Sequence, residues 1–138
     1  MPILYERDDA RRRVVETYVG TVTLKDLLNA LERQLADDAW SYAVLADARA
    51  VTKGPTPAEL HELLMRIGVL TCERGPRGRA AVVITDRTLA QMGEKFARLS
   101  ELTAYDVKIF DNIDAADHWL ELALDAHAET GASPRSEA

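Results

Sequence analysis

Residues 80–120 contain two strand-like segments in succession, each followed by a helix-like segment, and this repeat constrains the fold strongly. The strand-like segments are the short apolar runs at residues 80–84 and 107–110, and an Asp follows closely after each run. Apolar side chains then recur at helical spacing. Alternating strands and helices of this kind are typical of a largely parallel sheet covered by helices. The sequence therefore predicts an α/β fold.

The rest of the chain extends this alternation. An N-terminal hairpin comes first, with strands at residues 3–6 and 13–19 around a polar turn at residues 8–10, and Gly20 is expected to end its second strand. We expect a strand at residues 42–46 and helices at residues 24–39, at 57–73, over the segment containing Leu89, Met92, Phe96 and Leu99, and after Ile113. The predicted order is ββαβαβαβα, a mixed, mostly parallel sheet with helices packed on it. The hairpin strand at residues 3–6 should be antiparallel at an edge, and the strands near Tyr42, Ala80 and Val107 mutually parallel.

Composition limits the domain organisation. The 138 residues are 47% hydrophobic, which suffices for one domain with a real core and is too little chain for two. We expect a single domain over residues 1–127. Residues 128–138 carry no large apolar side chain, so we expect a flexible C-terminal tail there.

Charge and composition also exclude several classes of function. The net charge of −6 argues against nucleic-acid binding through phosphate contacts. Apolar runs of five or six residues are too short for a transmembrane segment, and no secretory leader opens the chain. The single Cys72 cannot form an internal disulfide, and with three scattered His residues it makes no zinc-binding spacing. We therefore expect a cytoplasmic protein without metal or cofactor.

Helix-start signals support the element order. Thr56, Pro57 and Glu59 form a capping-box pattern with Pro at the first helical position. Further predicted N-caps are Thr23 with Asp26, Thr88 with Gln91, and Asp114 with Asp117.

Three carboxylates follow predicted strands and are the first candidates for chemistry. Asp47, Asp86 and Asp111 would share the edge of the sheet where ligands of open α/β folds bind, and together they could hold Mg²⁺. The structural alternative, which we favour, is that each forms a turn or precedes a helix. Arg49 and Arg87 lie close enough in sequence to neutralise two of them.

Other polar and sulfur-containing positions have structural explanations. Residues 52–56 join a strand to a helix N-terminus, where Lys53 could attract an anion, although an ordinary capped turn explains the same segment. Residues 11–13 and 74–79 are expected to be loops whose arginine side chains are solvated. Gly75 is expected to end the helix before the second loop. Cys72 is expected to be a small core side chain rather than a reactive thiol.

The predicted order of strands and helices resembles that of the STAS domain over roughly residues 3–124. The resemblance is greatest to the stand-alone branch of SpoIIAA-like proteins. The matching features are the Asp47-Ala48-Arg49 strand end and the run AAVVITDRTLAQMGEKF. A V-x-x-F strand at residues 107–110 then leads to an A-x-x-W-L helix at residues 116–120. The resemblance implies non-enzymatic work, namely binding of a protein partner, a nucleotide or a lipid-like ligand.

One departure from this family concerns regulation. Anti-sigma-factor antagonists carry a phosphorylated Ser in an Asp-Ser-Ser/Thr-Gly segment at the start of the second helix. The corresponding residues 51–60 contain Thr52 and Thr56 but no Ser. No phosphorylation site is therefore carried over to this chain.

Two functional hypotheses follow. The first is a regulatory interaction module that docks a protein partner through Asp47, Arg49, Thr52, Lys53 and Thr56. The second is a carrier of a small apolar ligand or lipid, with a pocket between sheet and helices. An enzyme that uses the three Asp residues ranks well below both, and formation of homo-oligomers stays open.

The packing of two helices should discriminate between these hypotheses. Solvent-excluded packing would favour the interaction module, and an open apolar cleft would favour the carrier. The residues concerned are Leu60, Leu64, Met92 and Phe96.

Overall fold

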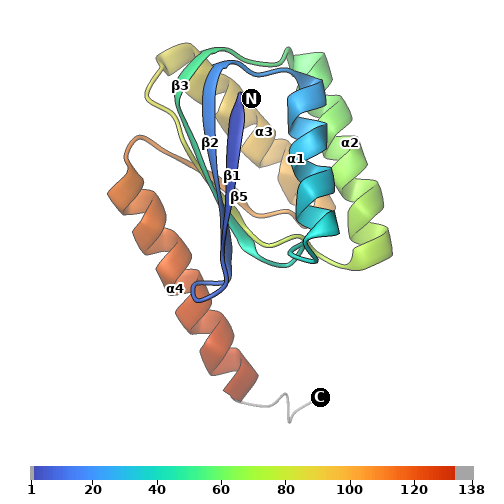
Figure 1. Cartoon of the computed structure of the whole chain (residues 1–138), viewed down its shortest axis with the longest axis vertical. Coiled ribbons are helices and arrows are strands. Elements are labelled where there is room, and N and C mark those ends of the chain that lie inside the picture. The colour runs from blue at the N-terminus through green and yellow to red at the C-terminus, as the bar shows by residue number, and fades with distance from the viewer. Residues whose placement is uncertain (1, 133–138) are drawn as a thin grey trace.

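A computed structural model describes residues 2–132, with side-chain burial defined up to residue 122. The elements alternate along the chain in the predicted order ββαβαβαβα, with one short 3₁₀ turn (Figure 1). They are β1 (Ile3–Asp8), β2 (Arg13–Thr21), α1 (Leu24–Ala36), β3 (Ala43–Lys53), α2 (Pro57–Arg74), β4 (Ala80–Val83), α3 (Arg87–Ser100), η1 (Glu101–Thr103), β5 (Val107–Phe110) and α4 (Ile113–Ala132).

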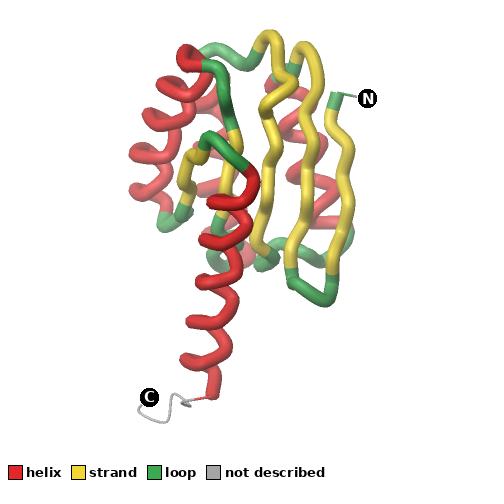
Figure 2. Tube along the Cα trace, turned by 90° about the vertical axis from the view of Figure 1, so that its left-hand side faces the viewer, coloured by secondary structure: helices red, strands yellow, loops and turns green. Residues whose placement is uncertain are grey.

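The five strands form one mixed sheet in the order β1-β2-β3-β4-β5 (Figure 2). β1 pairs antiparallel with β2 and forms one edge of the sheet, as predicted. β2, β3, β4 and β5 are mutually parallel, so the parallel alignment of the three later strands is confirmed. None of the helices among residues 2–132 is long and apolar enough to cross a membrane.

Helices cover both faces of the sheet, unequally. α1, α2 and α3 lie on one face and α4 lies on the other (Figure 1). The larger core, between the sheet and α1–α3, includes Leu31, Val44, Ile67 and Val107, each at most 9% exposed. The smaller core joins α4 to β3 and β4, with Leu120 2% exposed.

Three strands are longer than predicted: β1 continues to Asp8, and β2 and β3 are longer for one shared reason. Gly20 adopts a positive φ of 72° and lies at a register irregularity instead of ending β2, which continues to Thr21. Glycine tolerates this conformation without a steric penalty. Because β2 continues, β3 keeps a pairing partner as far as Lys53, which pairs with Thr21. The prediction that β3 ends at residue 46 and that residues 52–53 belong to a loop is therefore wrong.

Two of the predicted helix starts are also wrong. α3 begins two residues earlier than the predicted N-cap at Thr88 implies, because Asp86 is the N-cap and its carboxylate accepts the Leu89 N–H at 2.9 Å. At α4 the Asn112 side chain accepts the Ala115 N–H at 2.8 Å, in place of a cap at Asp114. The capping boxes at Thr23 and Thr56 are confirmed.

Three side chains lie in environments that differ from the predictions. Cys72 and Leu99 are exposed, because both lie on the outer faces of their helices. Arg13, predicted to be solvated, is 2% exposed, because the hairpin places it under α4, where it donates to Asp117 and, at 3.3 Å, to Glu121. This ion pair joins β2 to α4 and lowers the pKa of Asp117.

The C-terminal prediction is only partly covered by the structure. α4 continues to Ala132, so the first residues of the predicted tail are helical. The rest of that segment, residues 133–138, lies outside the described residues.

Candidate functional site

The carboxyl end of β3 carries most of the site residues predicted from the sequence. The Arg49 guanidinium donates two hydrogen bonds of 2.9 Å to the Asp47 carboxylate, from Nε to Oδ1 and from Nη2 to Oδ2. The Arg49 N–H also donates to Asp47 Oδ1 at 3.2 Å. The Arg49 side-chain hydrogen bonds lower the pKa of Asp47. Asp47 is thus neutralised locally, as the sequence predicted.

The other three predicted site residues divide into two kinds. Thr56 is committed to the α2 N-terminus: its hydroxyl accepts the Glu59 N–H at 3.2 Å, and the Glu59 carboxylate accepts the Thr56 N–H at 2.8 Å. Thr52 and Lys53 are exposed at the end of β3. Their side chains are therefore accessible to a partner, whereas the Thr56 hydroxyl already has a structural role.

The three carboxylates considered for Mg²⁺ do not form a metal site. Asp47 is paired with Arg49, Asp86 caps α3, and Asp111 accepts a hydrogen bond of 2.8 Å from the Asn112 side chain. Within the described part of the chain, no group of three or more His, Cys, Asp or Glu residues could hold a metal ion.

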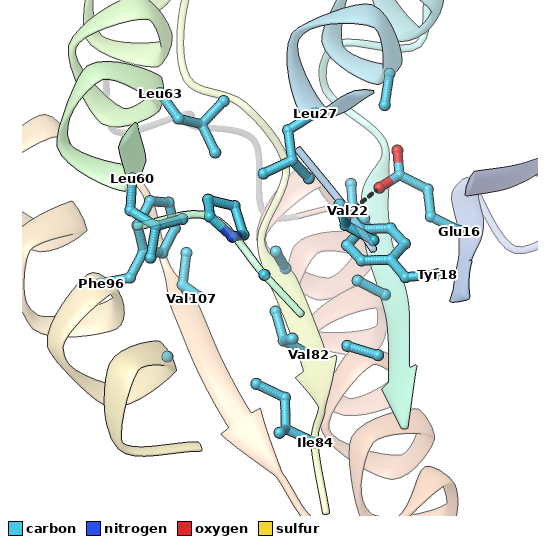
Figure 3. A pocket seen from close by; sticks show the side chains of 18 of the residues that line it. Glu16, Tyr18, Val22, Leu27, Leu60, Leu63, Val82, Ile84, Phe96 and Val107 are labelled. Carbon is cyan, nitrogen blue, oxygen red and sulfur yellow. Dashed lines mark hydrogen bonds between the residues drawn. The ribbon is translucent and has the colours of Figure 1, made fainter. Parts of the chain in front are cut away.

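A cavity of about 160 Å³ lies between the sheet and helices α1, α2 and α3 (Figure 3). Most of its wall is apolar, with side chains such as Val22, Leu27, Leu63, Val82 and Phe96. Four polar side chains also line it: Glu16, Tyr18, Arg77 and Tyr105. The loop after β3 contributes Gly54 and Pro55.

Glu16 is the most unusual of these side chains, because it is 2% exposed on the inner face of β2. The Tyr18 hydroxyl donates to Glu16 Oε1 at 2.7 Å, while no residue within the described ranges donates to Oε2. Burial, reinforced by the neighbouring Glu16 charge, raises the pKa of Tyr18 well above its ordinary value. Tyr18 is therefore a hydrogen-bond donor at any physiological pH.

Arg77 also lines the cavity and belongs to a second hydrogen-bond network. Its Nε and Nη2 donate to Gln34 Oε1 at 3.0 and 2.6 Å, and its Nη1 donates to the Tyr105 hydroxyl at 2.7 Å. Gln34 is fully buried and donates in turn to the Ala39 carbonyl at 2.8 Å. The prediction that the residue 74–79 loop is only a solvated loop is wrong for Arg77, because the loop folds under α1.

Sequence reasoning missed this polar group, although one signal was available. Val14, Glu16 and Tyr18 alternate on one face of β2, and Val14 is fully buried. A Glu at an inward position between an aliphatic and an aromatic residue indicates a buried carboxylate. Nothing local marks Arg77, whose partners are 43 and 28 residues away.

The packing of the four apolar side chains on α2 and α3 agrees fully with neither functional hypothesis. Leu64 is buried at 6% exposure, whereas Leu60, Met92 and Phe96 are half-buried. These three line the cavity, and all four also border a groove between α2 and α3. The packing by itself therefore does not separate an interaction module from a carrier.

Comparison with known proteins identifies the fold. The sequence matches no protein-family model and no curated protein. Among solved structures, an uncharacterized DUF3478-family protein from Shewanella loihica PV-4, described as having a SpoIIAA-like fold, superposes with a TM-score of 0.56. The alignment covers 86% of this chain and 91% of that chain at 17% identity. This chain has the SpoIIAA-like fold. The SpoIIAA-like resemblance inferred from the sequence is therefore confirmed at the level of fold.

A second solved structure gives a lower similarity score. It is the anti-sigma factor antagonist SpoIIAA in its unphosphorylated form, at a TM-score of 0.49 and 12% identity. The alignment covers 91% of this SpoIIAA-like chain and 97% of the other.

Proposed function

We propose that this SpoIIAA-like chain is a non-enzymatic regulatory module that binds a protein partner along the outer half of β3. The observation that supports this most directly is an unpaired strand edge. β4 pairs only with residues 44–47 of β3, and in the described part of the chain only β2 pairs with residues 48–53. An exposed strand edge offers main-chain donors and acceptors to an added strand.

The side chains around this edge favour an extended, acidic partner segment. Thr52 and Lys53 are exposed and make no side-chain hydrogen bond within the described residues. Arg49 is exposed too, but Asp47 neutralises it. Lys53 therefore supplies the uncompensated positive charge at the edge, and an acidic side chain on the incoming strand would complement it.

The same geometry supports a module without catalysis. The polar groups that could have served an enzyme at this end of the sheet have structural partners: Asp47 with Arg49, Asp86 with a helix N-terminus, and Thr56 with Glu59. Binding through main-chain groups and one cation needs none of them.

Site-specific photo-crosslinking tests this proposal. A photoreactive side chain at position 52 should crosslink one partner in a native lysate, and the same group at position 25 on α1 should not. Thr52→Ala and Lys53→Ala should weaken capture of that partner, while the matched variants Thr21→Ala and Lys25→Ala should not. Equal crosslinking from positions 52 and 25, or capture that Lys53→Ala leaves intact, would refute docking on β3.

A further inference from the structure

The cavity between the sheet and helices α1–α3 combines an apolar wall with one unsatisfied acceptor. Glu16 is 2% exposed and its carboxyl group points toward the cavity from β2 (Figure 3). Tyr18 satisfies Oε1, and within the described residues Oε2 has no donor. A buried carboxylate oxygen without a hydrogen bond is costly, and folded proteins rarely leave one in that state.

The neighbouring cation does not supply the missing bond. Arg77 lines the same cavity, but its side-chain hydrogen bonds go to Gln34 and to Tyr105. Its planar group also lies over the Trp40 and Tyr105 rings, with its central carbon 5.5 and 5.2 Å from their centroids. The guanidinium is therefore held in place, and Glu16 Oε2 is left without a donor among the described residues.

We propose that this cavity is a binding site for a small, mostly apolar molecule that donates one hydrogen bond, from a hydroxyl or amino group, to Glu16 Oε2. The volume of about 160 Å³ suits a molecule of about the size of benzene or slightly larger, since an engineered apolar cavity of about 150 Å³ binds benzene. The apolar wall supplies affinity, and the carboxylate supplies orientation and selectivity.

The cavity should select ligands by their ability to donate a hydrogen bond. A ligand with a hydroxyl group satisfies the carboxylate oxygen, whereas a ligand with only acceptors brings an oxygen lone pair against it. A carboxylic acid ligand is excluded in its ionised form, because it would place a second negative charge beside Glu16. The cavity shares Ala48 and Val51 with the outer half of β3, but the proposed ligand contact is made by Glu16 on β2 and the proposed partner contacts by Thr52 and Lys53. Substitutions at these separate positions let each proposal fail without the other.

Two isomeric probes test this selectivity. Benzyl alcohol and anisole have the same atoms, but only benzyl alcohol donates a hydrogen bond. We expect NMR titration of the ¹⁵N-labelled wild-type protein to show that both bind in the cavity. Nuclear Overhauser contacts should place the benzyl alcohol methylene next to the Tyr18 ring. Absence of binding, or binding only in the α2–α3 groove, would overturn the proposal without any variant being needed.

The variant Glu16→Gln tests the role of the carboxylate. The Gln carbonyl can still accept from Tyr18, which leaves an N–H donor where Oε2 was. The ratio of the anisole to the benzyl alcohol dissociation constant should fall by about tenfold or more, the size expected for a hydrogen bond to a charged group. Glu6→Gln, an exposed change on β1, is the matched control and should leave the ratio unchanged. An unchanged ratio in a folded Glu16→Gln protein would overturn the assignment of Glu16.

Discussion

Arg77 and Arg79 lie two residues apart in one loop, and the structure predicts very different costs for removing them. Arg77→Ala deprives Gln34 Oε1 of both of its donors and the Tyr105 hydroxyl of one, and these side chains are 0% and 4% exposed. An unsatisfied buried polar group costs about 1–3 kcal/mol, so we expect a total loss of about 2–4 kcal/mol. Arg79→Ala removes one ion pair, with Asp106 at 3.0 Å, whose side chain is 57% exposed, and the contact of the guanidinium with the Trp119 ring, 4.4 Å from the ring centroid. These two partly exposed contacts together should contribute at most about 1 kcal/mol.

Urea unfolding followed by circular dichroism measures this difference. With a slope of about 2 kcal/mol per molar urea, Arg77→Ala should lower the midpoint by about 1–2 M and Arg79→Ala by about 0.5 M or less. Arg77→Lys should recover only part of the loss, because an ammonium cannot reproduce the planar fork. If Arg77→Ala and Arg79→Ala shift the midpoint equally, the argument that Arg77 completes a buried network is wrong.

Two further predictions concern the carboxyl end of β3. Thr56→Ala removes the acceptor for the Glu59 N–H and should destabilise the protein by about 1 kcal/mol. Thr52→Ala changes an exposed side chain and should destabilise it by no more than about 0.5 kcal/mol. Thermal unfolding of both variants measures the difference. Because the folded-state pKa of Asp47 is lowered, its pairing with Arg49 stabilises the fold above the ordinary pKa of 3.8 and loses this effect as pH falls through the folded value. Asp47→Asn should therefore be less stable than wild type at pH 7, by less than about 1 kcal/mol. The difference in stability should close as the pH falls through the folded-state pKa of Asp47, and a difference independent of pH would contradict this.

The sequence alone determined the α/β class, the element order and the parallel strands, because these depend on local patterns. Hydrophobic periodicity and capping residues act within about four positions along the chain, as at Thr56 and Glu59 or at Asp47 and Arg49. The SpoIIAA-like fold could therefore be predicted, and so could the neutralisation of Asp47.

The tertiary structure decided the rest, because the contacts involved join distant parts of the chain. Arg13 became buried only when α4, about a hundred residues later, packed over it. The length of β3 depended on its pairing with β2, which continues through Gly20. From the sequence alone, a glycine at this position was expected to end β2. Glu16 and Arg77 reach the same cavity from β2 and from the loop before β4, and no sequence spacing links them. Local chemistry thus determined the elements, and only their packing brought Glu16 and Arg77 to one cavity.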